Sequence, residues 1–366
     1  MEESEVNKIT AKVLHNCRIA DSRYSGLHSI CGLAMRMRDL FKWENSLEPW
    51  VERDSSEVLE WIGKKEEEWD RLANREFEDI IIQDSRYDPF NTKEINELLE
   101  PHGLYYGAGY AGSLRPTFFL ANMEAKKRMD GHAVYILGRE QARDLLTLPA
   151  LVQDQSILIR KESGILFFWD KIFFINDSGR KALGFALKGH GIDPRDHKAL
   201  QKNLRKLFSA EIGRYVHHEL GEIKDPVFDR DLWREIVATF PHSAIELIAR
   251  TLKDLLADTT DHGTLKYIIR QRNGTSLAFY VAFLDGLAKK LFCQLDDAFP
   301  EFSRTHNWRL IEETVSDGYR TFTKHAERMS AIFREGRKKK DMDWTARQME
   351  KHMLTPLGLV SPIPPP

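Results

Sequence analysis

The sequence has few cysteines and no long hydrophobic run. Its three cysteines, Cys17, Cys31 and Cys293, are too few and too widely separated for a disulfide framework, and an odd number is typical of free thiols in a reducing compartment. The most apolar stretch, residues 277–292, is too short and too interrupted by charge to span a bilayer. The first residues, MEESEVNKIT, lack the basic start and apolar segment of a signal peptide. These absences predict a soluble, cytoplasmic protein.

An excess of charge of one sign is also lacking. The chain has 54 Lys and Arg residues against 56 Asp and Glu, so its formal net charge is −2. A near-neutral protein has no overall attraction to nucleic acid. The one dense basic run, REGRKKKD at residues 334–341, contains no aromatic residue and follows a long helical pattern, where it complements the helix dipole. Nucleic acid is therefore not expected as a partner. We expect a protein or a small molecule instead, and self-association is compatible with the sequence.

What the sequence does contain is typical of a globular protein with a substantial core. Hydrophobic residues make up 42% and charged residues 30% of the 366 residues, and this length favours two or three domains. Periodicity divides the chain into a helical region at 1–75, a mixed region with short strands at 76–194, a helical bundle at 195–352, and an extended or disordered tail at 353–366. The predicted class is α+β, predominantly α-helical, with a C-terminal helical bundle and a small β-containing middle region.

The middle region contains short β-rich runs separated by turn-forming residues. In KRMDGHAVYILG, the step Asp130-Gly131 predicts a tight hairpin turn. The run SILIRKESGILFFWDKIFFIN, residues 156–176, fits either two strands that turn at Ser163-Gly164 or one buried helix. Of these two, we expect a helix that is interrupted at Gly164.

The segment GAGYAG, residues 107–112, matches the spacing G-x-G-x-x-G. A dinucleotide-binding fold requires a helix to begin at the last glycine and an acidic residue about twenty positions later. Here SLRPTFFLAN follows, with Pro116 and a β-like run, and residue 132 is a histidine. We interpret the glycines as a tight turn or a flexible strand; a phosphate-binding flap between two strands is the alternative.

The C-terminal region shows a strong helical pattern. Within residues 306–333, apolar residues recur at spacings of three and four, which places them on one face of a helix. These residues are Trp308, Ile311, Val315, Tyr319, Phe322, Ala326, Met329 and Phe333. Pro226, Pro241 and Asn273-Gly274 separate further helices.

One segment of this bundle carries a high density of groups that bind metal ions. RYVHHELGEIKD, residues 214–225, contains H-E-x-x-E where zinc peptidases have H-E-x-x-H, so Glu222 stands in place of the second histidine. Gly221 and the following Asp225-Pro226 are compatible with a helix that ends here, which would let the polar side chains reach water. A helix that continues past residue 222 would instead turn them toward the core.

Helix geometry gives the direction of these side chains. At 100° per residue, one face of the helix is apolar. It is formed by Leu200, Leu204, Leu207, Phe208, Ile212, Tyr215 and Val216. Glu211, His218, Glu219 and Glu222 project on the same side, whereas His217 is expected to face water. Buried carboxylates are costly unless they are paired, hydrogen-bonded or bound to a metal ion, so this helix is the candidate functional element.

The residue types suggest a metal site. His218 and Glu222, at i and i+4, are placed to ligate one ion, with Glu219 in the position of a catalytic general base. Glu211 or His242 would complete the ligand shell. The candidate ions are Fe, Zn and Mn, and a histidine with several carboxylates suits iron or manganese better than zinc.

The same spacing recurs at His242 and Glu246. With thirteen histidines in the chain, about one H-x-x-x-E pair is expected by chance. The presence of two such pairs is therefore weak evidence for a metal site. On the helical wheel, Glu246, Asp254 and Asp258 lie opposite the buried stripe of their helix, and His242 lies at its edge.

Two classes of function follow. The first is a non-catalytic binding or structural protein, in which the inward polar groups pair with arginines of neighbouring helices and fix helix register. The second is a metal-dependent hydrolase or oxidoreductase that uses the H-E-x-x-E helix. Polar groups near a helix end usually form ion pairs, so the first class is the expectation and the second is the alternative.

Overall fold

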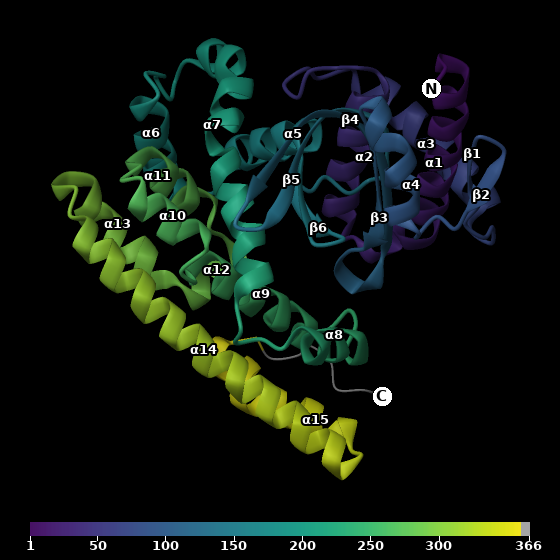
Figure 1. Cartoon of the computed structure of the whole chain (residues 1–366). Coiled ribbons are helices and arrows are strands. Elements are labelled where there is room, and N and C mark those ends of the chain that lie inside the picture. Colours follow the sequence, from purple (N-terminus) through teal and green to yellow (C-terminus); the bar gives the residue numbers. More distant parts are fainter. Residues whose placement is uncertain (360–366) are drawn as a thin grey trace. The chain divides into compact units, whose positions relative to one another are not determined.

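The structure of the chain, a computed structural model, describes residues 1–359. It divides into two compact units, Met1–Asp170 and Lys171–Pro366. The described strands lie between residues 80 and 160, whereas helices occur in both units (Figure 1). The predicted α+β class with a predominance of helix is therefore confirmed.

The N-terminal unit begins with three helices. They are α1 (Glu3–Tyr24), α2 (Ile30–Glu44) and α3 (Ser55–Leu72). Helix α2 is capped by the Ser29 hydroxyl, which accepts a hydrogen bond from the Gly32 N–H, and α3 by the Asp54 carboxylate, which accepts one from the Ser56 N–H. These caps satisfy backbone donors that have no partner inside the helix.

Two sheets follow the helices. The smaller consists of β1 (Ile80–Ile82) and β2 (Ser85–Tyr87), and helix α4 (Thr92–Leu99) comes after it. The larger has five strands in the order β3-β4-β5-β7-β6. They are β3 (Leu104–Tyr110), β4 (Pro116–Met129), β5 (His132–Arg143), β6 (Ala150–Gln153) and β7 (Ser156–Arg160). Strands β5 and β7 pair in parallel, and the other neighbouring strands pair antiparallel.

The hairpin turn at Asp130-Gly131 is confirmed. Met129 of β4 pairs with His132 of β5, and both turn residues have positive φ, 48° at Asp130 and 90° at Gly131.

The GAGYAG segment forms most of β3 and the turn that follows it, and the next regular element is β4 rather than a long helix. A dinucleotide-binding turn is therefore not formed. Packing requires glycine at position 107, because a Cβ atom there would lie 2.0 Å from the Phe119 ring.

The core of the N-terminal unit lies on both faces of the larger sheet, as the two-residue period of a strand requires. One face packs against α1 and α4. The core on this face contains residues of both helices and of the sheet, among them Ile9, Val13, Cys17, Ile95, Leu99, Tyr106, Phe118 and Leu120. The other face is formed by Tyr105, Phe119, Ala121, Tyr135, Leu137 and Leu158.

Residues 156–176 correct a prediction. The segment is neither a hairpin nor a helix interrupted at Gly164; it is strand β7 followed directly by helix α5 (Lys161–Phe173). Its apolar run changes period at Arg160, and periodicity alone does not separate a short buried strand from the buried helix that follows.

In the described part of the C-terminal unit, the regular elements are helices. They are α6 (Arg180–Gly189), α7 (His197–Lys224), α8 (Arg230–Thr239), α9 (Ala244–Thr259), α10 (Thr264–Arg270), α11 (Gly274–Phe283), α12 (Gly286–Leu291), α13 (Cys293–Thr305), α14 (Trp308–Lys339) and α15 (Met342–Met349). The apolar stripe predicted for residues 306–333 is the buried face of α14, with Ile311, Val315, Phe322, Ala326, Met329 and Phe333 in the core.

Residues 353–357, expected in the extended or disordered tail, form helical turns. A π-helical turn at Glu350–Leu354 and a 3₁₀ turn at Thr355–Leu357 follow α15. Met353 and Leu354 are buried, so apolar contacts hold this part of the chain against the unit. The prediction for residues 360–366 lies outside the described residues.

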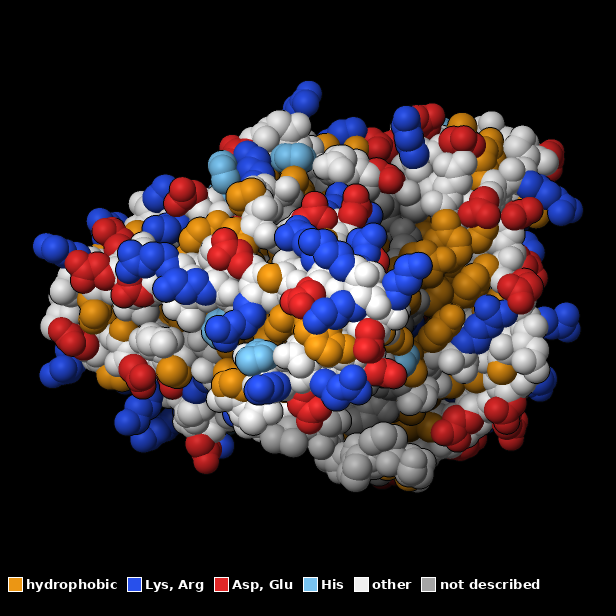
Figure 2. Space-filling model, turned by 90° about the horizontal axis from the view of Figure 1, so that it is seen from below, with side chains coloured by type: hydrophobic (Ala, Val, Ile, Leu, Met, Phe, Trp, Pro, Cys, Tyr) orange, Lys and Arg blue, Asp and Glu red, His pale blue; other side chains and the backbone are white. Residues whose placement is uncertain are grey.

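The surface mixes charges of both signs. Acidic and basic side chains are interspersed over most of the face drawn in Figure 2, together with one continuous patch of hydrophobic side chains. This mixture agrees with the near balance of 54 basic and 56 acidic residues. Within residues 1–359, no helix has the length and the hydropathy that a bilayer crossing requires.

Candidate metal centre

Helices α7 and α9 approach each other closely at the segment that carries His218. Helix α7 begins at Asp196, whose carboxylate accepts a hydrogen bond of 2.9 Å from the Ala199 N–H, and it continues to Lys224 without ending at Gly221. A Cβ atom at Gly221 would lie 2.0 Å from the carbonyl oxygen of Ala257 in α9. Glycine therefore permits this helix contact, which brings charged groups of both helices together.

The directions of the α7 side chains agree in part with the helical wheel. Glu211 and Glu219 are buried, as predicted, while the side chains of His218 and Glu222 are 27% and 21% exposed. His217, expected to face water, is partly exposed, and one face of its ring stacks on Tyr267 of α10 with 4.2 Å between centroids.

His218 is fixed by a carboxylate on the neighbouring helix. Its Nδ1 lies 2.8 Å from Oδ1 of Asp258, and the other oxygen of Asp258 accepts a hydrogen bond of 2.8 Å from the Tyr280 hydroxyl. Burial by itself lowers the pKa of His218, but the charge of Asp258 and the hydrogen bond to it raise that pKa well above its usual value. The imidazole is thereby held in one orientation.

Two further carboxylates, those of Glu222 and Asp254, lie near the imidazole. Nε2 of His218 lies 3.9 Å from Oε1 of Glu222, and one ligand atom each of His218, Glu222 and Asp254 lies within 4.8 Å of the others. A metal-ligating histidine almost always donates its other N–H to a carboxylate or carbonyl, which sets the tautomer and the ring direction. Asp258 has this relation to His218.

Glu219 is the candidate base. Its side chain is buried, and burial and neighbouring charges, rather than a hydrogen bond, act on its carboxyl group. Burial, followed by the negative charge of Glu222, raises the pKa of Glu219 to about 8. A carboxyl group without a partner is costly in such a place unless it is protonated or a cation lies nearby.

Charge in this cluster is not balanced. Four carboxyl groups face two basic side chains: Glu219, Glu222, Asp254 and Asp258 against His218 and Lys253. Nζ of Lys253 lies 2.6 Å from Oε2 of Glu222 and 4.4 Å from the centroid of the Trp233 ring. Lys253 thus neutralises part of the negative charge, and it would have to move before Glu222 could use both oxygens for an ion.

Glu211 and His242, expected to complete the ligand shell, lie elsewhere. Glu211 precedes His218 by two helical turns, accepts a hydrogen bond of 2.7 Å from the Ser276 hydroxyl, and has Nε of Arg214 at 3.5 Å. His242 lies in the loop before α9 with a φ of 58°. The structure brings neither residue to the cluster.

The spacing of His242 and Glu246 has a local explanation. The Glu246 N–H donates to the Ser243 hydroxyl at 3.2 Å, and Oε2 of Glu246 accepts from the His242 N–H at 2.8 Å. This reciprocal pattern caps the start of α9. Glu246 is buried, which corrects the prediction that it faces away from the core; Arg250 pairs with it at 2.7 Å.

Asp254 and Asp258 are the site residues that the sequence analysis did not assign. They are spaced i and i+4 on α9, and the helical wheel placed both opposite the apolar stripe of that helix. The available signal was therefore a pair of acids on one face of α9. Their proximity to His218 depends on the close contact of α7 and α9, which no pattern within either helix reveals.

Family models account for almost the whole chain. Residues 8–160 match the model described as Family of unknown function (DUF6866) N-terminal domain, and residues 166–352 match the corresponding C-terminal domain. Neither the curated proteins nor the solved structures provide a match. The junction between the two matched domains lies close to the boundary of the two compact units at residue 170. With both domains present in order, the chain belongs to the DUF6866 family.

Proposed function

We propose that the C-terminal unit binds a divalent metal ion through His218, Glu222 and Asp254, and that the protein is a metal-dependent hydrolase. The observation that carries this proposal is the orientation of His218. Asp258 holds Nδ1 at 2.8 Å, which leaves Nε2, 3.9 Å from Oε1 of Glu222, as the nitrogen available to an ion. A nitrogen ligand with two carboxylates suits Mn²⁺ or Fe²⁺.

The charge of the cluster supports a cation. Glu219, with a pKa of about 8, is largely neutral at neutral pH. The other three carboxyl groups still outnumber the two basic side chains, and a cation would supply the missing positive charge. Ligand atoms around such an ion lie roughly 3 Å apart, so the three side chains have to close from their present separation, which is within 4.8 Å. Lys253 has to release Oε2 of Glu222, while its contact with the Trp233 ring can persist.

Hydrolysis is the reaction class that the remaining groups suit. A divalent ion lowers the pKa of a bound water and so provides a nucleophile at neutral pH. Glu219 follows His218 directly. Its pKa of about 8 keeps it largely protonated at neutral pH, so it would act as a proton acceptor only once a bound cation lowers that pKa. Tyr280 keeps Asp258 in place by a hydrogen bond of 2.8 Å and has a positioning role.

Metal analysis tests the proposal. Protein purified without added metal should contain about one equivalent of Mn or Fe, or take up about one equivalent of Mn²⁺ in calorimetry. His218→Ala and Asp254→Asn should weaken Mn²⁺ binding by more than about 100-fold, since even the loss of an outer carboxylate costs 10- to 100-fold. The matched control is His242→Ala, which removes a histidine at the other end of α9 and should leave binding unchanged.

A second candidate is a non-catalytic structural cluster, and the ion pair of Lys253 with Glu222 favours it. In this case the polar groups of α7 and α9 already have their partners within the protein. Wild-type protein freed of metal would then have the same thermal midpoint with and without Mn²⁺, and His218→Ala would lower that midpoint equally in both conditions. That result would overturn the metal proposal.

A further inference from the structure

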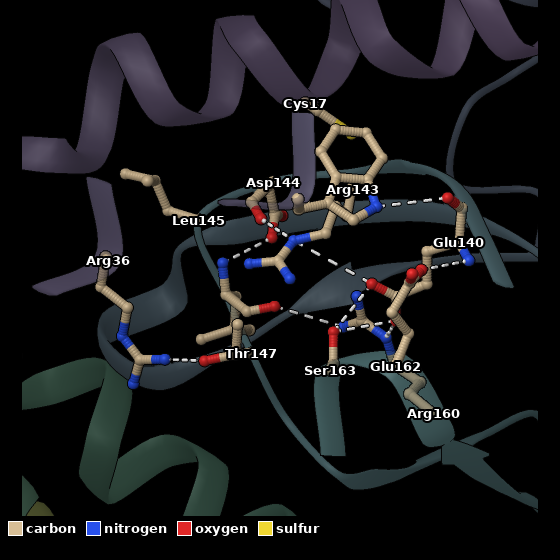
Figure 3. A network of polar contacts seen from close by, with 12 residues as sticks. Cys17, Arg36, Glu140, Arg143, Asp144, Leu145, Thr147, Arg160, Glu162 and Ser163 are labelled. Carbon is tan, nitrogen blue, oxygen red and sulfur yellow. Dashed lines mark hydrogen bonds and ion pairs between the residues drawn. The ribbon is translucent and has the colours of Figure 1, made fainter. Parts of the chain in front are cut away.

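A group of buried arginines occupies the N-terminal unit, at the end of β5. Figure 3 shows Arg143 in the middle of this network, with its head group directed toward the segment that contains Leu145 and Thr147. The side chain of Arg143 is fully buried. Its Nε donates to the Asp144 carbonyl at 3.2 Å, but neither terminal amino group has a hydrogen-bond partner. Leaving such donors unpaired in a protein interior is costly.

Two further arginines lie near Arg143. Arg36 of α2 donates to the Thr147 hydroxyl, and Arg115, at the end of the β3–β4 turn, contacts Nε2 of His28. Burial lowers the pKa of Arg36, as do the charges of Arg143 and Arg115, whereas the charges of Asp39 and Asp170 act in the opposite direction. Burial, Arg115 and Arg36 lower the pKa of His28 to about 4, so this imidazole is neutral at physiological pH and adds no positive charge.

The nearby acids do not supply the missing acceptors. The two oxygens of Asp144 accept backbone hydrogen bonds from Phe118 at 3.0 Å and Leu146 at 2.8 Å. Asp21 accepts one from the Leu145 N–H at 3.0 Å, and burial together with the charge of Asp144 raises the pKa of Asp21 well above its usual value. The protonated form of Asp21 is thereby favoured, and neither acid offers an oxygen to the terminal amino groups of Arg143.

Arg160 in the same network shows how a buried guanidinium is normally balanced. Its Nε lies 2.7 Å from Oε1 of Glu140, and Glu140 also accepts hydrogen bonds of 2.8 and 2.9 Å from the Ser163 hydroxyl. One terminal amino group of Arg160 still has no partner. Arg143 differs because its closest carboxylate oxygen, Oε2 of Glu140, lies 4.0 Å from Nε.

We propose that Arg143, Arg36 and Arg115 form a binding site for a phosphate group. Three guanidinium groups match the charge and the several acceptor oxygens of a phosphate, and guanidinium donors bind such oxygens strongly. Arg36 is the partly exposed member of the three and lies where a ligand would enter. The site belongs to the N-terminal unit and is independent of the metal proposed for α7 and α9.

Phosphate titration tests this site. Full-length protein, freed of metal on a chelating resin, is titrated with inorganic phosphate at constant ionic strength, with chloride as the reference anion. Calorimetry and ³¹P line broadening should show saturable binding, and the thermal midpoint should rise with phosphate concentration. Arg143→Met and Arg36→Gln should each weaken binding by at least about tenfold. The control is Arg86→Gln, which removes an exposed arginine of β2 and should bind as wild type does.

The outcomes separate the sources of the phosphate group. Tighter binding of a phosphomonoester such as phenyl phosphate than of inorganic phosphate identifies the phosphoryl group of a larger ligand; equal or weaker binding identifies the free ion. Absence of saturable binding in wild type, or equal binding in the Arg36, Arg143 and Arg86 variants, overturns the proposal. If Arg143→Met does not fold, Arg36→Gln, whose partner is a hydroxyl, gives the decisive measurement. Metal uptake by α7 and α9 is measured separately, so the failure of either site leaves the other testable.

Discussion

The two polar clusters of this protein carry opposite charge imbalances. In the C-terminal unit, the cluster on α7 and α9 has four carboxyl groups against two basic side chains, and its histidine is partly exposed. In the N-terminal unit, the cluster around Arg143 has guanidinium donors without acceptors, and its central side chain is fully buried. An unbalanced cluster costs stability unless a ligand of the opposite charge offsets it, so the sign of each imbalance indicates the sign of its ligand.

The largest expected effect is the difference in lost stability between Arg160, which pairs closely with a carboxylate, and Arg143, which does not. Arg160→Met should lower the free energy of unfolding by about 3 kcal/mol, because Glu140 is left buried without its partner at 2.7 Å. Arg143→Met, in the absence of phosphate, should change it by less than about 1 kcal/mol, because no carboxylate loses a close partner. Urea denaturation of both variants measures the difference. Equal losses would show that Arg143 is satisfied in the folded protein.

The second expected effect concerns the contact of α7 and α9. Gly221→Ala should destabilise the protein by about 2 kcal/mol, because the added methyl group meets the Ala257 carbonyl oxygen at 2.0 Å and forces the helices apart. Mn²⁺ affinity should fall in the same variant, since Asp254 moves with α9. The control is Gly63→Ala in α3, where nothing lies within 4 Å of the added Cβ and a gain of up to about 1 kcal/mol is expected. An unaltered urea midpoint for Gly221→Ala would contradict the close approach.

A third effect distinguishes a positioning carboxylate from a ligand. Asp258→Asn should weaken Mn²⁺ binding by about tenfold, less than the loss of His218 itself, because in the proposed site Asp258 would orient the imidazole without ligating the ion. Tyr280→Phe should have a smaller effect in the same direction, since it removes the hydrogen bond of 2.8 Å to Asp258. Calorimetric titration with Mn²⁺ ranks the two. Loss of binding in Asp258→Asn as complete as in His218→Ala would assign Asp258 as a ligand.

The smallest effect is a pH dependence in the N-terminal unit. Burial and the charge of Asp39 raise the pKa of Asp170 to about 7, whereas an unfolded aspartate titrates near pH 4. Between these values the folded protein keeps a proton that the unfolded chain releases, so stability falls as pH rises, by at most about 1.4 kcal/mol per pH unit. Asp170→Asn should flatten this slope, while Asp177→Asn, at a side chain that is 95% exposed, should not. If stability fell equally steeply with pH in wild type and in Asp170→Asn, the raised pKa of Asp170 would be contradicted.

Sequence patterns predicted the elements better than the sites. The hairpin at Asp130-Gly131 and the apolar stripe of α14 follow from rules that act within one or two neighbouring elements, and both are present. The strand-to-helix change at Arg160 was missed because a short apolar strand and a buried helix have the same local composition. Sequence patterns therefore predicted the features that are determined within one or two neighbouring elements.

The candidate sites depend on contacts between distant segments. His218 and Glu222 could be singled out because they share one helix, but Asp254 and Asp258 join them only through the crossing at Gly221. His242 was assigned to the site on spacing alone, although its spacing from Glu246 reflects helix capping. Arg143, Arg36 and Arg115 come from three separated elements, and no sequence motif connects them.

The packing of α1 sets the order in which the N-terminal unit can form during synthesis. Cys17 lies 3.2 Å from the Phe118 carbonyl, a contact between residues 101 positions apart in the chain. Helix α1 also packs on α3 and β1, but its apolar face is fully covered only once β4 has left the ribosome. Contacts of such sequence separation slow folding, so a nascent chain that stops before residue 118 leaves the part of this face that contacts β4 exposed to chaperones and to neighbouring chains.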